Sequence, residues 1–86
     1  MKVSIEITLA PLQKDYEQHI KEFIRELRAS SFEVHENSLS TQIYGDYEPL
    51  MLFLTQAIAR CFDALTAGMI HLKIVKSDRS NYRPFV

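Results

Sequence analysis

Residues 2–9 alternate almost strictly between polar and apolar side chains, and this run constrains the fold more than any other part of the chain. The apolar set is Val3, Ile5, Ile7 and Leu9, and the polar set is Lys2, Ser4, Glu6 and Thr8. A period of two is typical of a β-strand with one buried face. We therefore expect a strand that ends at Ala10 and Pro11, because proline cannot donate to a central ladder.

Two later segments have the period of an amphipathic helix. Apolar side chains recur three to four residues apart over residues 13–30 and 48–65, which predicts two helices with one apolar stripe each. The stripes are Tyr16, Ile20, Phe23, Ile24 and Leu27, and Met51, Leu54, Ile58, Cys61, Phe62 and Leu65. Leu52 and Phe53 lie off the second stripe. They are either ordinary exposed apolar residues or side chains that cover a partner chain.

Shorter alternating runs predict three further strands, over residues 32–35, 39–44 and 69–75. Asn37 and Ser38 supply turn chemistry between the first two, and Gly45 stops the second before the helix. The order is strand–helix–strand, twice. This is the βαββαβ order of the α+β, ferredoxin-like sandwich, with a four-stranded antiparallel sheet, two helices on one face and strand order 4-1-3-2. We expect this domain over residues 1–76, followed by a polar tail over 77–86 that is either disordered or folded over a neighbour.

Bulk composition excludes several classes of protein. The chain has 86 residues, with 10 basic and 11 acidic side chains, which fits one domain and argues against nucleic-acid binding through a basic face. No run approaches the 18 apolar residues of a membrane span, and the first residues lack the apolar core of a signal peptide. With a single cysteine, Cys61, we expect a cytoplasmic protein without a membrane partner.

The open face of the predicted sheet gathers polar side chains from all four strands. Alternation places on it Glu6, Thr8, Ser40, Gln42, Tyr44 and His71, among others. One interpretation is an ordinary solvated face of an antiparallel sheet. The other is a pocket, closed by a second sheet or a neighbouring chain, that suits a small heteroaromatic ligand. Thr41 falls on the helix side by the same alternation.

Catalytic and metal chemistry find little support in the sequence. His35 and His71 have no third ligand at a metal-like spacing, so we expect no metal site. Cys61 lies in an apolar helical stripe, which favours a core thiol. Asp46 and Glu48 sit where a helix begins and complement its dipole. We therefore expect no enzymatic activity and no cofactor; an enzyme using His35 or His71 is the least favoured alternative.

Three stretches carry a family resemblance. They are ITLAPL, EVHENSLSTQIYGDYEPLM and LTQAIARCF, at residues 7–12, 33–51 and 54–62. Together they resemble the YkoF-like family of thiamine- and hydroxymethylpyrimidine-binding proteins. The resemblance implies a ferredoxin-like fold, non-catalytic binding of thiamine or its pyrimidine, and homodimers or homotetramers. The positions that match the family are Glu6, Pro11, Asn37, Ser40, Thr41, Gln42, Gly45 and Tyr47.

The residue pattern and the family resemblance together give one leading expectation and one alternative. The leading expectation is binding of thiamine or a related pyrimidine on the open sheet face at a subunit interface. Its ligand-binding residues are Glu6, Thr8, Ser40, Thr41, Gln42, Tyr44 and His71. The alternative is a self-assembling interaction module without a small ligand.

Overall fold

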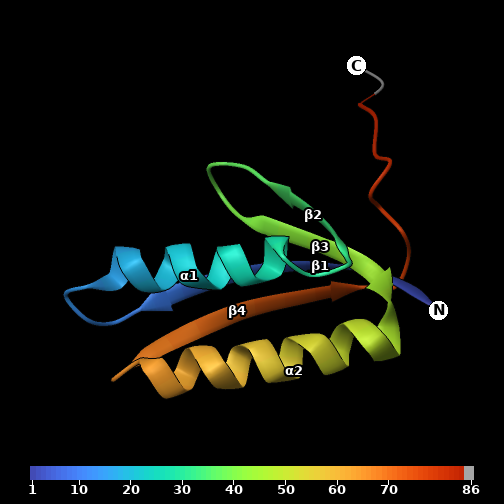
Figure 1. Ribbon diagram of the computed structural model, residues 1–86. Helices are drawn as coiled ribbons and strands as arrows, with labels where there is room; N and C mark the ends of the chain where they lie inside the picture. Colours follow the sequence, from blue (N-terminus) through green and yellow to red (C-terminus); the bar gives the residue numbers. More distant parts are fainter. Residues whose placement is uncertain (85–86) are drawn as a thin grey trace.

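The chain folds into a four-stranded sheet and two helices in the order β-α-β-β-α-β. The computed structural model describes residues 1–84. Its elements are β1 (Lys2–Pro11), α1 (Tyr16–Arg28), β2 (Glu33–Glu36), β3 (Thr41–Asp46), α2 (Tyr47–Ala64) and β4 (Gly68–Val75). The predicted α+β, ferredoxin-like fold is confirmed, and Figure 1 shows both helices running along the sheet.

The sheet is antiparallel throughout, with the order β2-β3-β1-β4. This is the predicted order. In the centre of the sheet Ile5 lies opposite Ile43 of β3 and Ile74 of β4. Residues directly opposite one another share a face, so Val3, Ile5, Ile7 and Leu9 mark the helix face. Glu6, paired with Gln42 and Lys73, marks the open face.

The helix face holds the core. Phe23 and Leu27 of α1, and Leu50, Leu54 and Ala57 of α2, pack there against the four apolar residues of β1 and against Ile43. Phe53 also packs against this core, with its ring 5.7 Å from that of Phe32, so its predicted exposure is wrong. Leu52 is exposed as predicted, whereas Tyr16 and Phe62 are exposed although they were assigned to the apolar stripes.

Two predicted boundaries are wrong at the start of β3 and of α1. The Asn37 side-chain oxygen accepts hydrogen bonds from the N–H groups of Leu39 and Ser40, so the turn extends through Ser40 and the strand begins at Thr41. Leu39 is consequently 87% exposed rather than on the core side. Gly45 lies within β3 instead of ending it. Helix α1 begins at Tyr16, because Gln13 bonds the Asp15 carboxylate and the N–H of Thr66 in a preceding turn.

The segment after β4 is tied to the sheet. The Ser4 hydroxyl donates to the Ser77 carbonyl at 2.7 Å and accepts from the N–H of Arg79 at 2.8 Å. Figure 1 shows this segment leaving the sheet beside the N-terminus. It contains no helix or strand in its described part, residues 77–84; the rest of the predicted tail, residues 85–86, lies outside the described residues. Within residues 1–84, neither helix has the length and apolar character needed to cross a bilayer.

Candidate functional site

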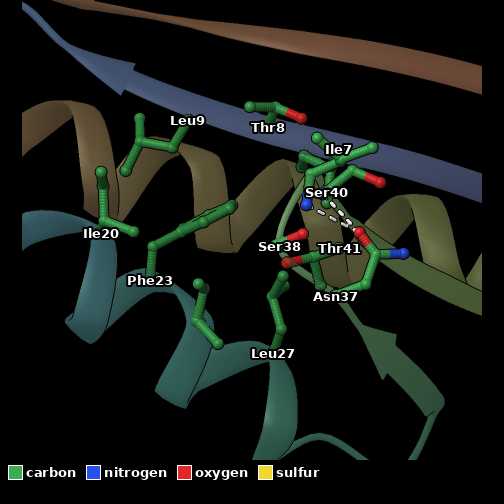
Figure 2. Close-up of a pocket in the computed structure, with 12 residues that line it drawn as sticks. Ile7, Thr8, Leu9, Ile20, Phe23, Leu27, Asn37, Ser38, Ser40 and Thr41 are labelled. Atoms are coloured by element: carbon green, nitrogen blue, oxygen red, sulfur yellow. Dashed lines mark hydrogen bonds between the residues drawn. The ribbon is translucent and has the colours of Figure 1, made fainter.

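A cavity lies where β1 continues past the beginning of β3. The last pair between these strands is Ile7 with Thr41, whereas β1 runs on to Pro11 alongside β4. The resulting notch is bounded by the turn of residues 37–40 and covered by α1. It encloses about 210 Å³. Figure 2 shows Ile20, Phe23 and Leu27 of α1 on one side of this notch cavity and the turn on the other.

The notch cavity is apolar on its walls and polar at its rim. Its apolar wall consists of Ile7 and Leu9 from β1 and Ile20, Phe23, Ile24 and Leu27 from α1. Hydroxyl and amide groups come from Thr8, Asn37, Ser38, Ser40 and Thr41. A mainly apolar lining with a few placed polar groups is the usual composition of a small-molecule site.

Asn37 fixes the shape of the rim. Its side-chain oxygen accepts from the N–H groups of Leu39 and Ser40 at 2.8 and 3.0 Å, and its own N–H donates to the Ser40 carbonyl at 3.1 Å. Such bonds from an asparagine to its own turn are a common way to hold a tight turn. The turn thus presents Ser38 and Ser40 to the cavity in a fixed arrangement.

Thr41 is the most buried polar residue of the cavity lining. It is only 7% exposed and lies on the helix face, as alternation predicts without any bulge. Its hydroxyl makes no hydrogen bond with another group of residues 1–84. No buried side-chain polar atom of the described residues lacks a partner, so this hydroxyl is open to the cavity, where water or a ligand can bond it. Thr41 therefore offers a donor and acceptor to whatever occupies the cavity.

Ser40 connects the cavity rim to the open face. Its hydroxyl donates to the Glu6 carboxylate at 3.0 Å and accepts from the Gln42 amide at 2.6 Å. The second oxygen of Glu6 lies 3.6 Å from the Lys73 ammonium. The predicted proximity of Glu6, Ser40 and Gln42 is therefore present in the structure. Ser40 thus borders the cavity and is hydrogen-bonded to the carboxylate on the open face.

Tyr44 lies further along the open face, beside a shallower hollow. This hollow measures about 160 Å³ and also touches Glu6, Gln42, Lys73 and Arg79. The Tyr44 ring packs 4.9 Å from that of His35. Burial, reinforced by the negative charges of Glu33 and Asp78, raises the pKa of the Tyr44 hydroxyl. Tyr44 is consequently a neutral hydrogen-bonding group at neutral pH.

The structure places six of the seven predicted site residues in two separate hollows. Thr8, Ser40 and Thr41 line the notch cavity, and Glu6, Gln42 and Tyr44 line the open-face hollow. His71 is exposed on β4 and borders neither. Sequence reasoning missed the wall of α1, namely Ile20, Phe23, Ile24 and Leu27, because a helical apolar stripe gives no sign that part of it faces a cavity.

Other hollows are less suited to a heteroaromatic ligand. One of about 300 Å³ borders four charged groups, Lys2, Glu33, Asp46 and Asp78. Another, between the helices, contains Cys61, whose thiol pKa is raised by burial and by the Glu26 charge. A raised pKa makes the nucleophilic thiolate scarcer. Within residues 1–84 no group of three His, Cys, Asp or Glu side chains has a metal-binding arrangement.

Solved structures share the fold of this chain although sequence comparisons find no match. No protein-family model matches this chain, and no curated protein matches it. The architecture is shared with a proposed thiamine biosynthesis/salvage protein from Thermotoga maritima, at 16% identity and a TM-score of 0.81, over 90% of this chain and 85% of that one. A Streptococcus pneumoniae protein has 21% identity and a TM-score of 0.83, over 91% and 89% of the two chains.

A third structure is the domain of unknown function DUF77 from Bacillus cereus, at 20% identity and a TM-score of 0.73, covering 99% of this chain and 79% of that one. At these identities the similarity establishes the fold alone. The class defined by fold and site is a small ferredoxin-like α+β domain with an apolar cavity beside the start of its third strand.

Proposed function

We propose that this protein binds thiamine or a related aminopyrimidine in the notch cavity, without converting it. The observation that carries the proposal is the Thr41 hydroxyl, which has no hydrogen-bond partner in residues 1–84 and opens into a mainly apolar cavity. The name given to the Thermotoga maritima relative supports the choice of ligand. The resemblance of residues 33–51 to a thiamine-binding family supports it independently.

The size of the cavity favours one ring. Its volume of about 210 Å³ is below the roughly 300 Å³ at which sites for drug-sized ligands begin. A methylated pyrimidine occupies it, with Phe23 available for an offset or edge-on ring contact. The thiazolium ring of thiamine extends through the notch toward the open face. There the Glu6 carboxylate supplies a negative charge, and the Lys73 ammonium lies 3.6 Å from one of its oxygens.

The side chains around the cavity support binding rather than catalysis. They are aliphatic, aromatic, hydroxyl and amide groups. Acid–base catalysis requires a titratable group within hydrogen-bond reach of the reacting atom. The nearest such group along the described contacts is Glu6, which is bonded to the far side of Ser40. The proposed role is therefore to hold a ligand.

Calorimetry with three compounds tests this function. We expect thiamine and hydroxymethylpyrimidine to bind, and the hydroxyethylthiazole half of thiamine alone not to bind. This ranking follows because the cavity takes the pyrimidine and leaves the thiazolium at the rim. Absence of heat with both pyrimidine compounds at millimolar concentration would refute the proposed function.

Self-association is a second candidate function, and β4 favours it. This strand spans eight residues at the edge of the sheet, where one side has no neighbouring strand. Leu72 and Ile74 on its helix side remain 39% and 43% exposed. A long apolar edge strand is a template for pairing with another chain. We propose that a second copy of this chain pairs there.

Light scattering coupled to size exclusion tests the self-association. Leu72→Lys should convert the oligomer to monomer, because it places a charge at the paired edge. Leu12→Lys, at another exposed leucine outside β4, is the matched control and should leave the oligomer intact. A monomeric wild-type protein would refute this second candidate.

A further inference from the structure

At each residue of β1 the main-chain N–H and C=O point toward either β3 or β4, and two hydrogen bonds show which. In an antiparallel sheet the N–H and C=O of one residue point to the same side, and successive residues alternate sides. The Met1 carbonyl accepts from the N–H of Tyr47, just beyond β3, at 2.8 Å. The Leu12 N–H donates to the Ala67 carbonyl, just before β4, at 2.9 Å. Odd-numbered residues of β1 therefore face β3, and even-numbered residues face β4.

Leu9 is the first odd-numbered residue that finds no strand opposite. The pairing with β3 ends at Ile7 and Thr41, and the same register places Leu39 opposite Leu9. Leu39, however, is in the turn, where its N–H donates to the Asn37 side chain. Neither the strand pairing nor the other hydrogen bonds of residues 1–84 supply a partner for the main chain of Leu9.

The residue that carries this main-chain pair is buried beside the cavity. Leu9 is only 8% exposed and lines the notch cavity together with Thr41. An unpaired backbone N–H or C=O that is removed from water costs free energy comparable to a lost hydrogen bond. Nearly all such groups in proteins are paired. The edge of β1 at Leu9 is thus prepared for a partner that the protein itself does not provide.

We infer that the N–H and C=O of Leu9 form the recognition edge for the ring of the ligand, an assignment that rests on the proposed function. The N–H donates to a ring nitrogen, and the C=O accepts from an exocyclic amine on the neighbouring ring carbon. The ligand class is therefore an aromatic heterocycle with an acceptor and a donor on one edge, as in a 4-aminopyrimidine. Thr41 then contacts the same ring from the opposite strand.

Pro11 limits this recognition to one residue. By the same alternation its nitrogen faces the open side of β1, where β3 is absent. Proline has no N–H to donate, and sheets accept it only where that donor is not needed. The open edge consequently offers one donor, at Leu9. A two-point contact with one edge of a ring uses this N–H together with the C=O of Leu9.

Amide hydrogen exchange measured by NMR tests the assignment in the free protein. The Leu9 amide should exchange about tenfold or more faster than those of Ile7, which pairs with β3, and Ala10, which pairs with β4. Addition of saturating hydroxymethylpyrimidine should slow the Leu9 amide by about tenfold and shift its proton resonance. The analogue lacking the 4-amino group should bind about threefold to tenfold more weakly, the effect of one net hydrogen bond.

The outcomes separate this assignment from the proposed function. A Leu9 amide in the free protein that is as protected as that of Ile7 would overturn the assignment. Calorimetric heat with hydroxymethylpyrimidine but no change at the Leu9 amide would also overturn it, while leaving the function intact. Absence of any heat would overturn the function and, with it, the assignment.

Discussion

The Ser40 hydroxyl donates a hydrogen bond to a carboxylate oxygen of Glu6 at 3.0 Å, across 34 positions of sequence. This bond joins the turn before β3 to the middle of β1. It also joins the two places between which the polar residues are divided, because Ser40 lines the notch cavity and Glu6 lines the open-face hollow. A hydrogen bond therefore connects the cavity rim to the open face.

Removing this link should weaken both folding and binding. In Ser40→Ala the bonds to Glu6 and from Gln42 are lost, so the free energy of unfolding in urea should fall by about 1 kcal/mol. The dissociation constant for hydroxymethylpyrimidine should rise by about threefold to tenfold as the rim loosens. Ser38→Ala is the matched control at the same rim. Equal effects of the two variants would argue against a special role for the Ser40 bond.

Thr41→Val isolates the contribution of the hydroxyl that opens into the cavity, since it keeps the shape of the side chain. The described residues give this hydroxyl no partner, so unfolding in urea should be unchanged or slightly harder. Binding of hydroxymethylpyrimidine should weaken by about threefold to tenfold, as measured by calorimetry. Wild-type affinity in Thr41→Val would show that the ligand does not use this group.

Gly45 is one of the positions that match the family resemblance. A substitution there tests whether this residue is needed for stability or for ligand affinity. A Cβ added there would lie 2.7 Å from Cδ1 of Phe32, whose ring packs on Phe53. The φ angle of Gly45 is not positive, so crowding rather than backbone strain sets the cost. Gly45→Ala should lose about 1–3 kcal/mol of stability in urea. The ligand affinity of the folded variant should stay unchanged, because Gly45 does not border the notch cavity; a large loss of affinity with normal stability would refute this structural role.

The ion pair between Arg28 and Glu36 predicts a pH dependence. Two hydrogen bonds from the Arg28 guanidinium lower the pKa of Glu36 from its ordinary value of 4.5. A carboxyl with a lowered pKa in the folded state adds stability above its unfolded pKa and loses it as the pH falls through the folded one. Glu36→Gln should thus unfold more easily than wild type at pH 7, and the difference should shrink below pH 4.5.

Urea unfolding across pH measures this, with Glu17→Gln on the exposed part of α1 as control. The pair connects the end of α1 to the end of β2 at the surface, so the effect should be smaller than that of any core truncation. A stability difference for Glu36→Gln that stays constant from pH 7 to pH 3 would contradict the role given to the pair.

Periodicity was sufficient for the architecture. The predicted alternation of Val3 to Leu9 and the predicted stripe containing Phe23 and Leu27 are confirmed, since these apolar residues are buried in the core. Periodicity was insufficient where local hydrogen bonds compete with it. Leu39 continues the alternation of β3, yet the Asn37 side chain captures its N–H and turns it to solvent. Leu72 and Ile74 alternate correctly and remain partly exposed, because an edge strand receives less cover.

The candidate site was predicted only in part for a related reason. Thr8 and Ser40 were identified because alternation places them on the open face, and Thr41 because it matches the family resemblance; all three line the notch cavity. The wall from α1 was not, since Phe23 has the same periodic position whether it contacts protein atoms or an empty space. The open edge at Leu9 depends on the unequal reach of β1 and β3, which only the register reveals.

An intermolecular NOE experiment with hydroxymethylpyrimidine bound to the ¹³C-labelled protein would locate the ligand. Binding in the notch cavity predicts contacts from the ligand's ring methyl group to the side chains of Phe23, Leu27 and Thr41, which line that cavity. Contacts only to Tyr44, Lys73 and Gln42 would place the ligand in the open-face hollow and contradict binding in the notch cavity.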